Sequence, residues 1–108
     1  MMTRGLLLAP VAALLLPVPQ PVAAAPQTHV VIIEKMKFGV LPAGLKAGDT
    51  IVWDNRDMFR HTATARDGSF NIDLPAGAKG RTVVRKAGAI AFICKYHPGM
   101  TGVLRVAR

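Results

Sequence analysis

The sequence predicts a small all-β domain, a Greek-key β-sandwich or barrel of about seven short strands. Two observations lead to this fold class. Gly and Pro recur every several residues, with 10 Gly and 8 Pro among 108 residues. The apolar runs between them are short and rich in Val, Ile and Thr, which is typical of strands. Almost nothing beyond the N-terminal region has the apolar period of a helix.

The first 24 residues are predicted to be a secretory leader rather than part of the fold. A short positive start at residues 1–4 precedes an apolar run over residues 5–16, which Pro10 interrupts. The small side chains at residues 22–24 then fit signal-peptidase cleavage before Ala25. The apolar run is too short and too broken by proline for a comfortable membrane span. The alternative is an uncleaved N-terminal anchor.

Cleavage before Ala25 leaves 84 residues, enough for one small domain. These carry 13 Lys and Arg against 6 Asp and Glu, which favours an acidic partner or an anionic membrane surface. The basic residues are scattered and no recognition helix is evident, so no nucleic-acid partner is expected. The single cysteine cannot form an internal disulfide. In an oxidising compartment, such a thiol is expected to be buried or bound to a metal.

The expected strands are short apolar segments between turn signals. They cover residues 29–34, 50–54, 61–65, 81–85, 89–94 and 101–106. Met36 and Phe38 alternate with lysines and are therefore expected to face the core. Ile51 and Trp53 share one face of their strand for the same reason. Residues 69–74 are expected to form an irregular crossing.

Residues 94–100, Cys-Lys-Tyr-His-Pro-Gly-Met, carry the strongest chemical signal in the chain. Thiolate, imidazole and thioether together suit copper, and one Cys, two His and a weak axial Met make up the electron-transfer copper site. Because Cys94 closes one strand and Met100 opens the next, all three donors lie on one expected loop at the end of the sandwich. The Pro and Gly of this stretch fit a tight loop.

The second histidine has two candidates. His29 stands at the start of the expected domain, where order is least expected, and is interpreted as a solvated side chain. His61 opens a strand after a loop and faces the same end of the fold as residues 94–100. The predicted metal ligands are therefore His61, Cys94, His97 and Met100. No Ser/His/Asp set or carboxylate pair has a spacing that suggests acid–base or nucleophilic catalysis, so no enzyme is predicted.

These motifs resemble those of the cupredoxins, the type 1 blue-copper proteins, and among them the small amicyanin- and plastocyanin-like electron carriers. The matching stretches are Cys94-x-x-His97-x-x-Met100, Trp53-x-Asn55-Arg56-x-x-x-x-His61 and the closing Gly102-Val103. The resemblance implies one type 1 copper ion held by His61, Cys94 and His97. It also implies that Met100 is a long axial ligand and that the fold is cupredoxin-like.

Two supporting contacts are implied as well. Asn55 is expected to hydrogen-bond to the cysteine loop, and the backbone N–H of Thr62 is expected to donate to the Cys94 sulfur. The chain departs from the family at three positions. Arg60 stands where Pro is frequent, Thr62 where Asn is usual, and Tyr96 where amicyanin-type loops have Pro. These departures affect the potential and the partner more than the ligand set.

The sequence thus predicts a periplasmic monomer that carries electrons by cycling one copper ion between Cu(II) and Cu(I). The resemblance implies that the exposed edge of His97 is the electron portal, and an apolar patch at Leu41, Pro98 and Gly99 is expected to surround it. Basic residues such as Lys95 and Arg60 are expected to steer an acidic redox partner, for example a dehydrogenase or c-type cytochrome. No stable membrane insertion is expected. The alternatives are a periplasmic copper-binding or delivery protein and a structural zinc site, although zinc seldom takes Met.

Overall fold

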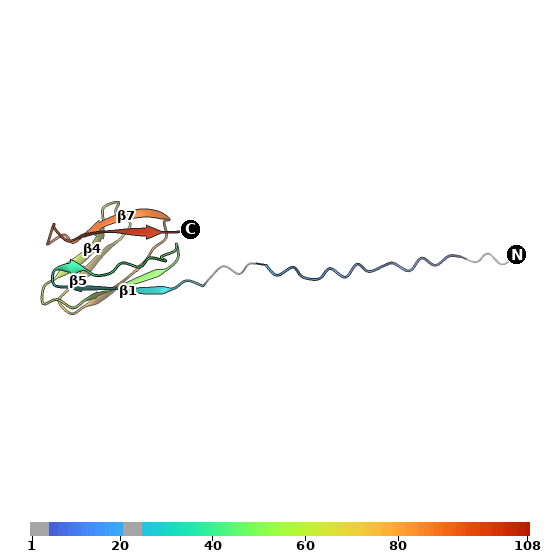
Figure 1. Cartoon of the computed structure of the whole chain (residues 1–108), viewed down its shortest axis with the longest axis horizontal. Helices are drawn as coiled ribbons and strands as arrows, with labels where there is room; N and C mark the ends of the chain where they lie inside the picture. The colour runs from blue at the N-terminus through green and yellow to red at the C-terminus, as the bar shows by residue number, and fades with distance from the viewer. Residues whose placement is uncertain (1–4, 21–24) are drawn as a thin grey trace.

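Eight strands pack as two four-stranded sheets in the computed structural model, which describes residues 5–20 and 25–108 (Figure 1). The strands are β1 (Thr28–Glu34), β2 (Lys37–Phe38), β3 (Thr50–Asn55), β4 (His61–Ala65), β5 (Asn71–Leu74), β6 (Lys79–Val83), β7 (Gly88–Ile93) and β8 (Thr101–Val106). The predicted all-β sandwich is therefore confirmed, with one strand more than expected.

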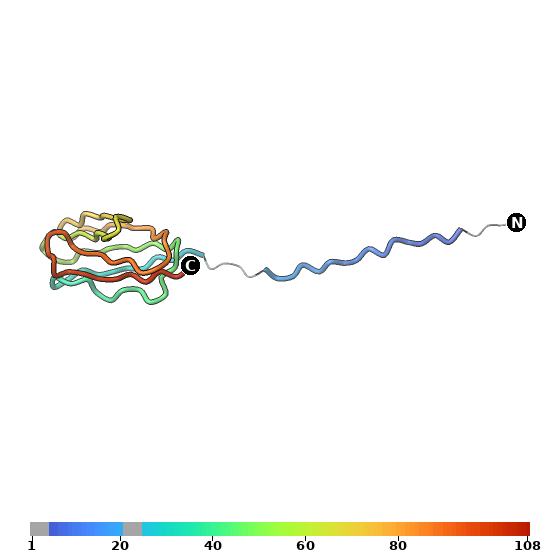
Figure 2. The backbone as a smooth tube through the Cα atoms, turned by 90° about the horizontal axis from the view of Figure 1, so that it is seen from above, coloured from blue at the N-terminus to red at the C-terminus, as the bar shows by residue number. Residues whose placement is uncertain are grey.

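One sheet has the order β2-β1-β3-β6 and the other β5-β4-β7-β8. β1 and β3 run parallel, whereas all other paired strands are antiparallel. The loops that follow β1 and β3 therefore lie at one end of the sandwich. We call this the loop end, made of residues 35–36, 56–60 and 94–100, and the end where β1 and β3 begin the far end. Figure 2 shows that the C-terminus also lies at the far end.

The core forms where the inner faces of the two sheets meet. Ile51 and Trp53 are both fully buried, which confirms that they share the inner face of β3. The Trp53 ring packs edge-on against Phe92, with ring centroids 5.2 Å apart, and Phe38 packs against Phe92 at 4.8 Å. The indole N–H of Trp53 donates to the hydroxyl of Thr82 at 3.1 Å, so the buried ring leaves no polar group unpaired.

The expectation that Met36 faces the core is wrong. Lys35 and Met36 have φ values of 53° and 58° and form a two-residue turn between β1 and β2. A positive φ at both turn positions matches the twist of a hairpin. Because the chain reverses at these residues, strand alternation does not continue through them. Met36 is 36% exposed, whereas Phe38 does pack against the core as predicted.

The segment expected to be an irregular crossing contains β5 instead. β5 pairs with β4, with His61 opposite Leu74 and Ala63 opposite Ile72. Leu74 is fully buried and Ile72 packs against the core, so the strand alternates in the normal way. It has only four residues at the edge of a sheet, directly before Pro75, and this shortness weakens its pattern in the sequence.

Residues 5–20 form neither helix nor strand and extend away from the sandwich (Figure 1). Their large apolar side chains are exposed, with Leu7 at 98%. The predicted cleavage motif at residues 22–24 lies outside the described residues. Within the described part of the chain, no helix has the length and apolar character needed to cross a membrane.

Candidate metal centre

The loop between β7 and β8 brings its sulfur donors to fixed positions. The N–H of Cys94 donates to the carbonyl of Met100 at 3.0 Å, and the N–H of Met100 donates to the carbonyl of His97 at 2.8 Å. The first bond continues the β7–β8 ladder, which pairs Ile93 with Thr101, and the second closes a turn within the loop. Cys94 is fully buried and Met100 is 5% exposed. Both residues therefore sit where the sequence predicted, at the two ends of one tight loop.

His61 lies beside the cysteine, at the start of β4. Its side chain is fully buried, and its Nδ1 lies 3.7 Å from the Cys94 sulfur. The adjacent strands β4 and β7 pair at two positions, Thr64 with Ile93 and Ala65 with Phe92. Toward the loop end, the contacts between β4 and the β7–β8 loop involve side chains instead. There the imidazole of His61 and the thiol of Cys94 face each other.

Thr62 links β4 to the β7–β8 loop. Its backbone N–H points at the Cys94 sulfur with an N to S distance of 3.4 Å, as the family resemblance implied. Its hydroxyl accepts a hydrogen bond from the N–H of Lys95 at 2.9 Å. The threonine that replaces the usual asparagine thus keeps a side-chain bond across the site. An N–H donor to sulfur stabilises a thiolate.

The second predicted histidine of the site, His97, is partly buried on the same loop. Its ring packs edge-on against the His61 ring, with centroids 4.9 Å apart, and against Phe59 at 6.4 Å. The structure thus brings His61 and His97 together and places Cys94 against His61. Among the described residues, no three His, Cys, Asp or Glu side chains are arranged so that they could hold a metal ion as they stand.

His29 lies at the far end, near the start of β1, and takes no part in this cluster. It is not solvated as expected, since its side chain is only 18% exposed and its Nε2 lies 2.9 Å from Asp49. The carboxylate holds the ring against the fold. Sequence position alone placed His29 at an unordered start, whereas Asp49 is contributed by a turn 20 residues later.

Asn55 does not reach the cysteine loop, so that implied contact is wrong in this structure. Its amide group donates to the carbonyls of Phe59 (2.8 Å), Leu74 (3.0 Å) and Pro75 (3.2 Å). Its side-chain oxygen accepts from the N–H of Asp57 at 3.0 Å. These bonds satisfy the buried amide within its own surroundings. Asn55 therefore fixes the loop before His61 onto the end of β5.

Sequence reasoning missed Asp57, which contacts the outer nitrogen of His61. Its Oδ2 lies 2.7 Å from His61 Nε2, and the carboxylate also accepts the backbone N–H groups of Lys35 and Met36. Burial raises the pKa of Asp57, but the hydrogen bonds from His61, Met36 and Lys35 outweigh it and hold the pKa below its usual 3.8. The only signal in the sequence was an acid four residues before a histidine.

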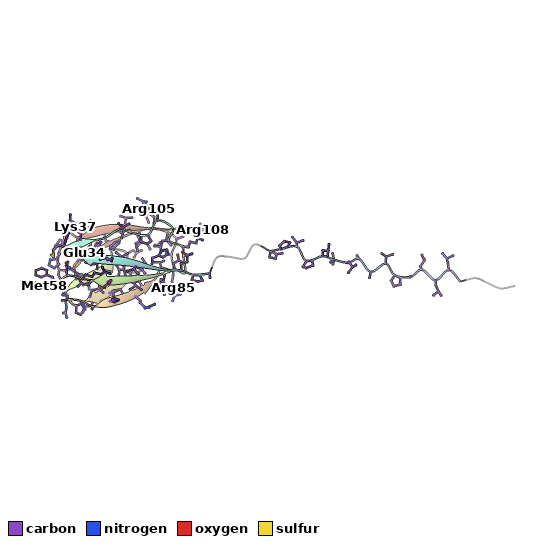
Figure 3. The ribbon with its side chains drawn as sticks, turned by 60° about the horizontal axis from the view of Figure 1, so that its bottom comes forward. Glu34, Lys37, Met58, Arg85, Arg105 and Arg108 are labelled. Carbon is purple, nitrogen blue, oxygen red and sulfur yellow. The ribbon has the colours of Figure 1, made fainter. Side chains whose placement is uncertain are left out.

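Large apolar side chains are exposed at the loop end. Met58 is 87% exposed, and Phe59 and Tyr96 are each 54% exposed. Leu41, expected in this patch, packs partly buried against the core instead. The side-chain view in Figure 3 places Met58 at the loop end. Beside Met100, a surface hollow of about 310 Å³ is lined by Met36, Lys37, Phe38, Gly99, Met100 and Thr101.

Charged residues flank this surface. Arg60 lies 3.8 Å from Asp73, so its charge is partly balanced. Lys95 is exposed on the ligand loop. At the far end, Figure 3 labels three further arginines, Arg85, Arg105 and Arg108. The positive charge of the domain is thus spread over both ends rather than concentrated at the site.

Comparison with known proteins identifies the family, although no family model matches the chain. Amicyanin from Paracoccus versutus is 34% identical over 92 residues, which cover 77% of this chain and 70% of that protein. A solved proline-to-phenylalanine variant of amicyanin in its reduced state has a TM-score of 0.63 and 27% identity, over 80% of this chain and 86% of that one. A methionine-to-alanine variant in the Cu(I) form has a TM-score of 0.62 and 27% identity, over 80% and 86%. By both sequence and fold, the chain belongs to the amicyanin-like cupredoxins.

Proposed function

We propose that this protein is an electron carrier that holds one type 1 copper ion and cycles it between Cu(II) and Cu(I). The proposed ligands are His61, Cys94 and His97, with Met100 as the weak axial ligand. The observation that carries the proposal is the buried contact between Cys94 Sγ and His61 Nδ1 at 3.7 Å, with a backbone N–H aimed at the sulfur. Membership of the amicyanin-like cupredoxins supports the same donor set.

The chemistry of the donors fits copper better than zinc. A thiolate and a thioether are soft ligands that suit Cu(I), while imidazole serves both copper oxidation states. Zinc sites of structural type use several cysteines, and Met100 would contribute nothing to one. The full burial of Cys94 and His61 keeps water from these positions. The donor set and its burial therefore match a site that retains its metal through repeated redox cycles.

The protein's own residues prepare the site for electron transfer. Copper, when bound, supplies the one-electron couple. Cys94 and Met100 are fixed by the strand ladder, and His61 is the first residue of a paired strand. Such anchoring limits the rearrangement between the two oxidation states. The N–H of Thr62 stabilises negative charge on the sulfur, and water is excluded from both fully buried donors.

The route for electrons is proposed through His97. It is the most exposed of the four proposed ligands, and its ring packs against the exposed Phe59. A transient complex needs little buried area, and an apolar contact around an exposed ligand edge suits rapid exchange. The excess of basic residues favours an acidic redox partner. We propose that residues 1–24 direct export to the periplasm, where the domain acts as a monomer.

The test is a visible absorption spectrum of residues 25–108, which contain all eight strands. Cu(II) is added, followed by ascorbate and then reoxidation. We expect an intense blue band that bleaches and returns. Copper that is released on reduction would favour copper delivery instead. A weak, pale spectrum would overturn the type 1 assignment.

Cys94→Ser provides the first prediction and the control for this experiment. Because the intense band arises from the thiolate bound to copper, the variant should lose essentially all of the colour. Unfolding in urea, monitored by Trp53 fluorescence, checks that the metal-free variant still folds. A variant that stays blue would mean that Cys94 is not the ligand.

A further inference from the structure

One carboxylate at the loop end connects the proposed ligand His61 to a turn in the opposite sheet. Asp57 Oδ2 lies 2.7 Å from His61 Nε2 and 3.0 Å from the backbone nitrogen of Met36. Its Oδ1 accepts the N–H of Lys35 at 2.8 Å. The side chain of Asp57 is 12% exposed. Three donors thus converge on a single, nearly buried carboxylate.

The turn that Asp57 holds is an unfavourable one for its residues. Lys35 and Met36 both have φ above 50°, a region that favours Gly, Asn and Asp. Long side chains adopt it only where the surroundings enforce it. The carboxylate accepts both backbone N–H groups of the turn and so compensates for this conformation. The turn and the ligand therefore depend on the same residue.

The contact also fixes which nitrogen of His61 can bind a metal. A carboxylate acceptor 2.7 Å from Nε2 places the ring proton on Nε2. The lone pair then lies on Nδ1, the nitrogen 3.7 Å from the Cys94 sulfur. A carboxylate that accepts from a metal-bound histidine also makes the imidazole a stronger donor. A stronger donor favours the higher charge of Cu(II).

We propose that Asp57 is a positioning residue that directs His61 Nδ1 toward the metal, holds the turn at residues 35–36, and favours Cu(II) over Cu(I). This inference rests on the proposed copper site. It predicts that loss of the carboxylate raises the reduction potential. It also predicts that further mutations can restore the turn while the reduction potential stays raised.

Asp57→Asn tests this with little change of shape. The amide has one acceptor oxygen, whereas the three donors approach both oxygens of the carboxylate. Whichever way the amide turns, its NH₂ group faces at least one donor. One orientation loses the bond to Lys35, and the other loses the bonds to Met36 and His61. In both, His61 loses its charged acceptor, because a hydrogen bond to a neutral amide oxygen is weaker than one to a carboxylate. Asp67→Asn is the matched control, because Asp67 carries the same charge but bonds to Ser69 in the turn between β4 and β5.

The reduction potential of each variant is measured by redox titration of the blue band. Removing a carboxylate partner of a metal-bound histidine typically lowers metal affinity about 10- to 100-fold. A tenfold loss of Cu(II) affinity relative to Cu(I) raises the potential of a one-electron couple by about 59 mV. We expect at least this rise for Asp57→Asn and no rise for Asp67→Asn. An unchanged potential in Asp57→Asn would overturn the proposal.

A second variant separates the effect on the ligand from the effect on the turn. Lys35→Asn with Met36→Gly gives the turn a sequence that adopts its φ values without help. Added to Asp57→Asn, these changes should restore the urea midpoint and the protection of the turn amides from hydrogen exchange. The potential should stay raised. A potential that returns with the turn would show that Asp57 acts only on the fold.

A readout on the copper-free protein keeps this inference distinct from the proposed function. The ¹⁵N shifts of His61 report which ring nitrogen carries the proton. We expect the Nε2–H form in the native protein and in Asp67→Asn, and a mixture of forms in Asp57→Asn. If the native protein shows no blue band, the proposed function fails, while the ring measurement still decides whether Asp57 positions His61. The same ring form in all three proteins would overturn the positioning role.

Discussion

The two ends of the sandwich contain the same polar unit. At the far end, Asp49 accepts the backbone N–H groups of Gln27 and Lys46 and lies 2.9 Å from His29 Nε2. At the loop end, Asp57 also accepts two backbone N–H groups and lies 2.7 Å from a histidine Nε2. In both cases one carboxylate holds a histidine and a reversal of the chain.

The difference lies in what the other side of each histidine meets. His61 is fully buried and its Nδ1 faces the sulfur of Cys94, whereas the side chain of His29 keeps 18% of its surface exposed. The far end is also closed by backbone bonds, for example from the N–H of Val84 to the carbonyl of Asp49. A carboxylate–histidine pair is thus a structural unit of this fold. Only the one placed against the cysteine loop becomes a candidate ligand.

Replacing each histidine by glutamine should give the largest difference between the two ends, seen in the visible spectrum. His61→Gln should abolish the blue band, since loss of a ligand exceeds the roughly 10- to 100-fold loss of affinity caused by removing a supporting hydrogen bond. His29→Gln should leave the spectrum unchanged and lower the urea midpoint. The visible spectrum and the unfolding curve of both variants check this. A blue His61→Gln protein would exclude His61 as a ligand.

The second largest effect concerns the far end, where Asp49 should make the stability of the fold depend on pH. Hydrogen bonds from Gln27, His29 and Lys46 lower the pKa of Asp49 from 3.8 to about 2. Because the unfolded chain binds this proton more readily, Asp49 stabilises the fold above about pH 4, and this contribution is lost between about pH 4 and pH 2. Asp49→Asn should therefore be less stable than the native protein near pH 6, and the difference should shrink as the pH falls. The copper-free protein is unfolded in urea at each pH. A constant difference would contradict the prediction.

The smallest effect concerns a link found at the loop end. Thr62→Val removes the hydroxyl that accepts from Lys95 N–H but retains the backbone N–H that faces the Cys94 sulfur. We expect a loss of about 1 kcal/mol in the free energy of unfolding and an almost unchanged potential. Thr50→Val, at the start of β3 and therefore at the far end, is the control, because the Thr64 hydroxyl bonds to that of Thr62. A large shift in the potential of Thr62→Val would show that the hydroxyl itself tunes the site.

The fold and the candidate donor residues could be predicted from the sequence because both depend on local patterns. Residues 61–65 and 101–106 were predicted with the bounds that the structure has. The spacing from Cys94 to His97 to Met100 is a feature of one loop, which turn geometry holds together. The ligand assignment itself remains a prediction until copper is measured.

The errors occurred where a contact joins distant parts of the chain. Alternation placed Met36 in the core because a pattern of apolar residues does not reveal a positive φ, which here depends on Asp57, 21 residues away. Asn55 was assigned to the cysteine loop, although nearer carbonyls satisfy its amide. His29 seemed free because its partner lies in another turn. Such pairs are set by the packing of the sheets and not by spacing.

The parallel pairing of β1 with β3 has a practical consequence. β1 begins at the far end, and after β8 the carbonyl of Ala107 accepts from the N–H of Ala47 at the same end. Both termini of the folded domain are therefore on the side opposite His97. A linker, affinity tag or electrode attached through either terminus would orient the molecule with the proposed electron portal at His97 facing outward. Immobilised protein should thus remain accessible to a partner in solution.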